Sequence, residues 1–142
     1  MLGAAESETV KNYAFAASAL VAYLEGRPGA ERVTEALAEA RAETARIVMS
    51  VVNWGEVYYH VWRWRGPQQA EKTLLLIDQL PIQLIAADRA LSLRAATLRA
   101  KYGLPYADCF AAAVAQQEKA RLVASDSDFR AVEREVRILW LR

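Results

Sequence analysis

The sequence has one cysteine, Cys109, and one histidine, His60. A lone thiol cannot close an internal disulfide, and it cannot form a cysteine-based metal site by itself. Cys109 lies in an apolar helical run, where a buried free thiol is the expected state. The sequence therefore excludes a fold held together by disulfides and gives no support to redox chemistry.

Long apolar runs are also missing. The run at residues 14 to 24 is interrupted by Ser18 and is shorter than the roughly 20 residues that a membrane-spanning helix needs. The first residues, MLGAAESETVK, are acidic and lack the basic segment that opens a secretory signal peptide. We therefore predict a cytoplasmic protein with no membrane association.

Neither sign of charge is in excess. The 18 Lys and Arg residues and 17 Asp and Glu residues leave a net charge of +1, so no global basic surface indicates nucleic-acid binding and any such contact must be local. A chain of 142 residues with 54% hydrophobic residues is long enough to bury one core, with little room for a second. We expect a single domain.

Short apolar runs alternate with helical patterns along the chain. We expect strands at residues 13–17, 46–52, 82–85, 122–124 and 136–141, and helices at 19–25, 28–42, 53–65, 68–80, 88–101 and 105–119. This alternation predicts an α/β fold: a mostly parallel central sheet of about four to five strands, flanked by helices and joined by right-handed crossovers. Residues 1–11 are expected to be a loosely ordered leader, and residues 12–142 the domain.

Acidic residues follow the predicted strands at the edge where such sheets bind ligands, outside the carboxyl ends of the strands. Glu56 lies in the helix after the second strand, Asp108 in the first turns of a later helix, and Asp126 after the fourth strand. Clustered carboxylates repel one another unless a cation neutralises them, and Mg²⁺ and Mn²⁺ prefer hard oxygen ligands. The pattern favours a magnesium-type site without Cys or His ligands.

Each acid also has an ordinary structural explanation. Asp108 suits the positive end of a helix, Asp126 and Asp128 are common turn and cap residues, and Glu56 could be a solvated helix residue. Helical spacing, however, places Asn53 and Glu56 on one face, from which both could point into one cleft. The joint placement of the acids, rather than any one of them, favours a site.

The segment 57–65 combines aromatic and basic residues, among them His60, Arg63, Trp64 and Arg65. Such side chains can stack on bases and bind phosphates. Aromatic residues at helical spacing more often pack in a core or against a partner protein, which is the favoured interpretation here. His60 shares the face of Glu56, so contact with substrate or metal is a further hypothesis for it.

Four segments follow one another in the chain: YAFAASAL at 13–20, SVVNWGEV at 50–57, LPYADC at 104–109 and LVASDSDF at 122–129. In this order they resemble the PIN-domain family, in particular the toxins of VapBC-type toxin–antitoxin pairs. The resemblance spans residues 12–142. It implies a PIN-like domain and a Mg²⁺- or Mn²⁺-dependent endoribonuclease that acts as the toxin of a type II pair. It also implies an RNA substrate, a cognate antitoxin that sends an arginine toward the acids, and a homodimer.

Carried over by position, the resemblance implies a set of site residues. It assigns metal binding to Glu56, Asp108 and Asp126, and the lining of the site to Ser18, Asn53, Ser125 and Asp128. One or two bound ions would activate water for hydrolysis of an RNA phosphodiester bond.

The chain departs from the family pattern at Ala16, where members usually have an aspartate. Alanine has no oxygen to hold a cation, so we expect weaker metal binding and a large loss of turnover, with the fold and the RNA cleft preserved. A natural loss and a deliberate Asp-to-Ala change that allows a toxic nuclease to be produced are both open; the rest of the motif is kept, which favours the second. An alternative function is a non-catalytic PIN-fold module that binds RNA or antitoxin, and a third is a purely structural α/β protein.

Overall fold

The computed structural model describes residues 10–142 and contains one five-stranded sheet in the order β3-β2-β1-β4-β5. The strands are β1 (Lys11–Phe15), β2 (Ala45–Ser50), β3 (Gln83–Ile85), β4 (Arg121–Ala124) and β5 (Ile138–Trp140). All four neighbouring pairs are parallel. The predicted α/β class with a parallel, helix-flanked sheet is confirmed. The expected leader lies almost wholly outside the described residues, and Lys11, its last residue, is already part of β1.

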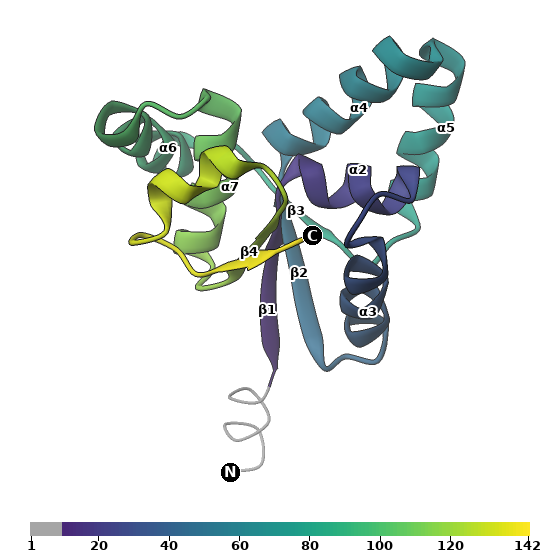
Figure 1. Cartoon of the computed structure of the whole chain (residues 1–142), viewed down its shortest axis with the longest axis horizontal. Helices are drawn as coiled ribbons and strands as arrows, with labels where there is room; N and C mark the ends of the chain where they lie inside the picture. The colour runs from purple at the N-terminus through teal and green to yellow at the C-terminus, as the bar shows by residue number, and fades with distance from the viewer. Residues whose placement is uncertain (1–9) are drawn as a thin grey trace.

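Helices cover both faces of the sheet (Figure 1). They are α2 (Ala17–Glu25), α3 (Ala30–Arg41), α4 (Val51–Arg65), α5 (Pro67–Asp78), α6 (Arg89–Tyr102) and α7 (Tyr106–Gln117), with a 3₁₀ helix η1 (Ser127–Val132). Successive side chains of a strand point to opposite faces. Tyr13 and Phe15 therefore pack with α2 to α5, whereas Ala14 packs with α6, α7 and η1. Among the described residues, no helix has both the length and the apolarity needed to cross a bilayer.

The strand order places a switch point next to β1. The chain leaves β1 through α2 and α3 to reach β2 on one side, and it reaches β4 on the other side through α6 and α7. Helices that begin after β1 and β4 therefore diverge to opposite faces and leave a crevice at the carboxyl ends of these strands. In Figure 1 the C-terminus lies between the two groups of helices.

The ends of the first two strands differ from the sequence prediction because the helix that follows each begins earlier than expected. The apolar run 46–52 predicts a strand to residue 52, but β2 ends at Ser50 and α4 begins at Val51. The Ser50 hydroxyl accepts a hydrogen bond from the Val52 N–H at 3.1 Å, and this cap outweighs the β preference of the two valines. The first strand likewise ends at Phe15 rather than at residue 17, because Ala17 opens α2.

A glycine packs the loop before α3 against the end of the chain. Gly29 has a φ of +91°, and a Cβ there would lie 2.6 Å from Leu141 Cβ. We expect Gly29→Ala to lower the free energy of unfolding by about 2–4 kcal/mol, through left-handed strain and overpacking together. Gly26→Ala is the matched control, with a φ of +66° but nothing within 4 Å, and should cost only about 1 kcal/mol. Urea denaturation measures both; equal losses would contradict the close contact with Leu141.

Candidate functional site

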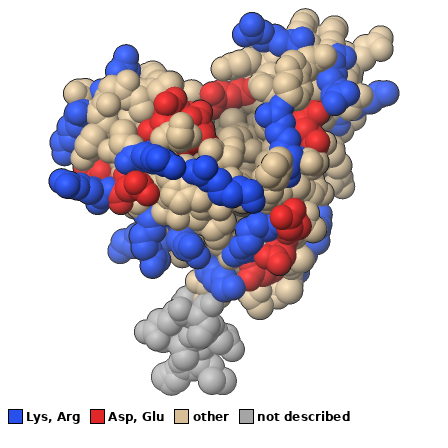
Figure 2. Space-filling model, viewed as in Figure 1, with Lys and Arg blue, Asp and Glu red and all other residues tan. Residues whose placement is uncertain are grey.

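A cavity of about 430 Å³ lies in the crevice at the carboxyl ends of β1 and β4. Its wall combines one face of α2, one face of α4, the start of α7, the β4–η1 junction and the C-terminus. Of the residues singled out in the sequence it is lined by Ala16, Ser18, Glu56, His60, Asp108, Ser125 and Asp126. Figure 2 shows acidic side chains gathered at the hollow between the two groups of helices.

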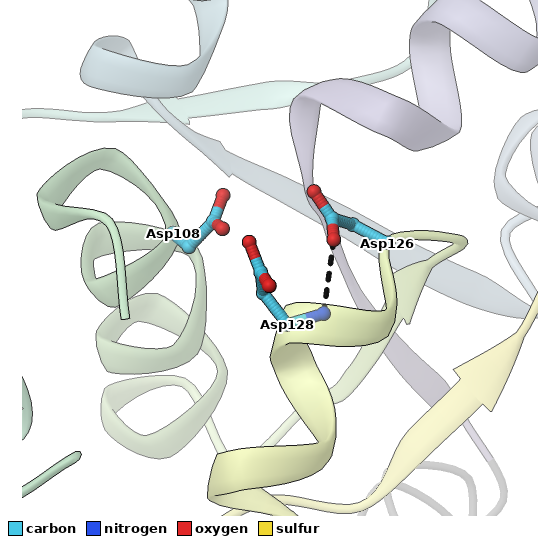
Figure 3. Close-up of side chains that lie close together, drawn as sticks. All are labelled: Asp108, Asp126 and Asp128. Atoms are coloured by element: carbon cyan, nitrogen blue, oxygen red, sulfur yellow. Dashed lines mark hydrogen bonds between the residues drawn. The ribbon is translucent and has the colours of Figure 1, made fainter. Parts of the chain in front are cut away.

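Three aspartates form a tight group at this cavity (Figure 3). Asp108 from α7, Asp126 from the β4–η1 junction and Asp128 from η1 each offer a carboxylate oxygen, and these atoms lie within 4.8 Å of one another. Asp126 accepts a hydrogen bond from the Asp128 N–H at 2.9 Å. Asp128, predicted only to line the site, is thus a member of the group, whereas Glu56 lines the cavity beside it.

Local structure explains why these acids lie together. Asp108 is in the first turn of α7 and Asp126 is the N-cap of η1, so both carboxylates lie at the positive end of a helix. Each position is a usual one for an aspartate. What is unusual is that two helix N-termini meet at the same sheet edge.

The electrostatics of the group call for a cation. Burial raises the pKa of Asp108 to about 7, and the charges of Asp126, Glu56 and Asp128 add to the shift. Burial and the charge of Asp126 also raise the pKa of Glu56, against the lowering effect of its hydrogen bond from Asn53. None of these four acids forms an ion pair within residues 10–142. An all-oxygen, uncompensated donor set of this kind fits Mg²⁺ or Mn²⁺.

Asn53 connects the two sides of the site. Its side chain is buried, and Nδ2 donates to Glu56 Oε1 at 2.8 Å and to the Ala107 carbonyl at 2.9 Å. Both partners are acceptors, which fixes the amide orientation and leaves Oδ1 without a partner among the described residues. Asn53 therefore holds Glu56 next to the start of α7, as the shared helical face predicts. Asn53 itself is not among the residues that line the cavity.

Ser18, Ser125 and Ala16 connect the start of α2 to the carboxyl end of β4. Ser18 Oγ accepts a hydrogen bond from the Ser125 N–H at 3.1 Å, which ties the first turn of α2 to the end of β4. Ala16 is the N-cap of α2, only 2% exposed, and its N–H donates to the Val123 carbonyl. A side chain at position 16 therefore lies at the wall of the cavity that Asp108 and Asp126 line.

The predicted contact residues of α4 separate into two groups. His60 lines the cavity, and its Nε2 has no hydrogen-bond partner in the described part of the chain. Arg63, Trp64 and Arg65 lie at the outer end of α4 and do not line it. Arg65 forms a 2.6 Å ion pair with Glu25, and the rings of Trp64 and His60 contact each other with centroids 4.8 Å apart and planes tilted by 47°.

The sequence prediction missed several residues of the cavity wall, among them Arg27, Tyr59, Phe129, Leu141 and Arg142. Three of them had a signal in the sequence. Tyr59 is three residues after Glu56 on the same helix, and Leu141 and Arg142 follow the last strand, at the carboxyl edge of the sheet where ligands bind. No sequence pattern indicated Arg27, because only the turn after α2 places it in the cavity wall.

The raised pKa of Asp108 predicts a pH-dependent stability. Its pKa is about 7 in the fold and about 3.9 in an unfolded chain, so the folded state binds this proton more tightly. The stability that the proton confers is present below about pH 4 and lost as the pH rises through about 7. At about pH 8 in EDTA, Asp108→Asn should therefore raise the free energy of unfolding by about 1–2 kcal/mol, less than the full shift because water and salt screen the group.

Urea denaturation of both proteins across this pH range is the measurement. The difference should shrink toward about pH 4, and added Mg²⁺ should stabilise the unaltered chain more than the asparagine variant. A difference that stays constant from about pH 4 to about pH 8 would contradict the assignment of a raised pKa to Asp108.

Comparison with known proteins gives one sequence match and several structural ones. A sequence model of the family described as PIN domain matches residues 15–135. No curated protein matches the chain significantly in sequence. Among solved structures, the VapBC2 complex of Rickettsia felis bound to a DNA fragment from its promoter has a TM-score of 0.74 and 18% identity, covering 92% of this chain and 99% of that chain.

Two further structures share the arrangement of elements. VapC20 of Mycobacterium tuberculosis, described as a toxin that cleaves the sarcin–ricin loop, has a TM-score of 0.68 and 16% identity, covering 84% of this chain and 94% of that one. FitAcB of Neisseria gonorrhoeae has a TM-score of 0.61 and 17% identity, covering 89% and 96%. At these identities the likeness establishes the fold.

Proposed function

Because the chain belongs to the PIN domain family, we propose that it is a divalent-metal-dependent endoribonuclease, with turnover impaired by Ala16. It would act as the toxin of a type II toxin–antitoxin pair in the cytoplasm. One observation carries the proposal: three aspartate carboxylates within 4.8 Å of one another and Glu56 beside them, none of them ion-paired among the described residues. Like charges this close together repel one another and are unfavourable unless a bound cation neutralises them.

The residues divide into two roles. Asp108, Asp126 and Glu56, joined by Asp128, would hold Mg²⁺ or Mn²⁺, while Ser18, Asn53 and Ser125 fix the elements that carry them. A bound divalent cation supplies activation of water and stabilisation of charge on the phosphate. With a pKa of about 7, Asp108 would carry a proton part of the time near neutral pH, and a bound divalent cation would favour its ionised form.

Partners follow from the family and from the similar structures. The VapBC complexes among them support a cognate antitoxin as partner of this chain, and a homodimer is part of the same proposal. The α4–α5 pair offers apolar surface for such contacts, since Trp62 and Trp64 near the end of α4 and Leu75 and Leu76 near the end of α5 are all exposed.

The test is cleavage of an end-labelled pool of structured RNAs by the chain and by its Ala16→Asp variant, each with Mg²⁺, Mn²⁺ or EDTA. We expect internal cuts by the variant with either metal, no cuts in EDTA, and little or no cutting by the unaltered chain. Circular dichroism confirms that both proteins are folded. Failure of the folded variant to cut any RNA in either metal would contradict the proposal.

The second candidate is a non-catalytic PIN-fold module that binds RNA or an antitoxin. Ala16 is the observation in its favour, because the position lies at the cavity wall and offers no ligand. The module predicts that RNA or antitoxin binding is unaffected by EDTA and that Ala16→Asp leaves the chain unable to cut. Efficient Mg²⁺-dependent cutting by the unaltered chain would eliminate it.

A further inference from the structure

The cavity is lined by groups of opposite charge. Its acids are Glu56, Asp108 and Asp126, and its arginines are Arg27 and Arg142. Ser18, Val21 and Ala22 of α2 also line it, and Arg27 follows this helix. The end of the chain lies against the same turn, since a Cβ at Gly29 would lie 2.6 Å from Leu141 Cβ. A ligand that fills the cavity must therefore suit both the acids and the arginines.

Both arginines lie over an aromatic ring rather than in an ion pair. The guanidinium carbon of Arg27 lies 4.4 Å from the ring centroid of Trp64, and that of Arg142 lies 5.4 Å from the ring centroid of Trp140. Neither side chain takes part in an ion pair within residues 10–142. A guanidinium that contacts a ring in this way keeps N–H groups for an anion, and phosphate matches their geometry well.

The apolar part of the cavity wall suits a nucleobase. Val21, Ala22 and Leu141 give it a largely apolar surface, and Tyr59 contributes an exposed aromatic ring. His60 adds a ring nitrogen, Nε2, that is buried and has no hydrogen-bond partner among the described residues. A base has flat apolar faces and hydrogen-bonding edges, and single-stranded RNA is bound by aromatic stacking combined with edge contacts.

We propose that the part of the cavity wall formed by Arg27, Pro28, Tyr59, His60, Leu141 and Arg142 binds one nucleotide of the RNA strand next to the bond presented to the acids. The base packs against Tyr59 and His60, and the adjoining phosphate binds Arg27 and Arg142. This inference rests on the proposed function. Charge favours RNA over a peptide as the occupant, because an apolar peptide would leave two guanidinium groups uncompensated.

Nucleotide binding in this pocket can be tested separately from metal binding. Its residues are complete in the unaltered chain and none of them is one of the acids, so nucleotide binding should need neither Mg²⁺ nor an aspartate at position 16. Binding can therefore be measured without cleavage, on the chain as it is and in EDTA. The probes are fluorescein-labelled hexanucleotides of each of the four RNA bases, followed by anisotropy.

Arg27→Gln and Arg142→Gln are each expected to weaken binding about tenfold and to reduce the slope of log affinity against log salt by about 0.7, the value for one lost phosphate contact on a single strand. Tyr59→Leu should weaken binding about fivefold or more without changing that slope. Arg41→Gln and Arg89→Gln are the matched controls, since both arginines are exposed but lie outside the cavity, and neither should change affinity or slope. Thermal melts confirm that every variant is folded.

Unchanged affinity in both Arg27→Gln and Arg142→Gln would overturn the inference, as would Arg-dependent binding of a labelled polyglutamate peptide with no binding of any hexanucleotide. These outcomes can be distinguished from failure of the proposed function. If Ala16→Asp cuts RNA and the two arginines have no effect on binding, the nucleotide pocket is wrong and the ribonuclease stands. If Ala16→Asp cuts nothing while the arginine effects appear, the pocket stands and the ribonuclease fails.

Discussion

Replacing Ala16 by aspartate is expected to raise the rate of metal-dependent RNA cleavage by about 100-fold or more. Position 16 is the N-cap of α2 and lies at the wall of the cavity that Asp108 and Asp126 line. A carboxylate there adds an oxygen ligand and a negative charge where a divalent cation would bind. The loss of one well-placed stabilising group in an active site costs about 10²–10³ in rate, and its restoration should return a similar factor. Initial rates on one labelled RNA in Mg²⁺ measure the effect.

Ala16→Asn is the matched control, because asparagine has the size and polarity of aspartate without its charge. It should cleave no faster than the unaltered chain. Since position 16 is only 2% exposed, the aspartate variant should also be less stable than the chain in EDTA and should gain more stability from Mg²⁺. If the folded aspartate variant were as slow as the asparagine variant, Ala16 would not be the cause of low turnover.

In the Ala16→Asp background, Asp126→Asn is expected to lower the cleavage rate by about 100-fold or more. Asp126 offers a carboxylate oxygen within 4.8 Å of those of Asp108 and Asp128, and its charge raises the pKa of both Asp108 and Glu56. Asparagine caps a helix as well as aspartate does, so the hydrogen bond from the Asp128 N–H should survive and the loss should reflect charge alone. Cleavage rates in saturating Mg²⁺ measure it.

Asp88→Asn provides the control for this variant. Asp88 is also a helix N-cap, whose Oδ1 accepts a hydrogen bond from the Leu91 N–H at 2.9 Å, but it does not line the cavity. Its substitution should leave the rate unchanged. Equal losses from Asp88→Asn and Asp126→Asn would indicate a general effect on stability and would contradict a metal-binding role for Asp126.

The fold class follows from the sequence because its causes are local. Alternating apolar runs and helical patterns specify a parallel sheet covered by helices. Ligands bind outside the carboxyl ends of such strands, so Glu56, Asp108 and Asp126 can be selected as candidate site residues without any structure. Helical periodicity also predicts that Asn53 and Glu56 share a face, and the two side chains form a 2.8 Å hydrogen bond. These features depend on spacing along the chain, which a sequence displays directly.

The missed features depend on contacts between distant segments. Arg27 and Arg142 come to one cavity from the turn after α2 and from the end of the chain, and no pattern in the sequence links these places. Asp128 was expected only to line the site, but it joins the aspartate group because η1 turns its side chain toward α7. A short 3₁₀ helix has no sequence pattern that predicts this orientation. The end of β2 was misplaced because one serine cap outweighed two β-branched residues.

The most direct test of the metal centre is the anomalous diffraction of Mn²⁺ in crystals of the Ala16→Asp variant, with the unaltered chain as comparison. The account predicts an anomalous peak in the variant at about 2.0–2.3 Å from carboxylate oxygens of Asp108 and Asp126, and a weaker peak or none in the unaltered chain. A variant crystal soaked in Mn²⁺ with no peak between these aspartates, or with Mn²⁺ bound only elsewhere, would contradict it.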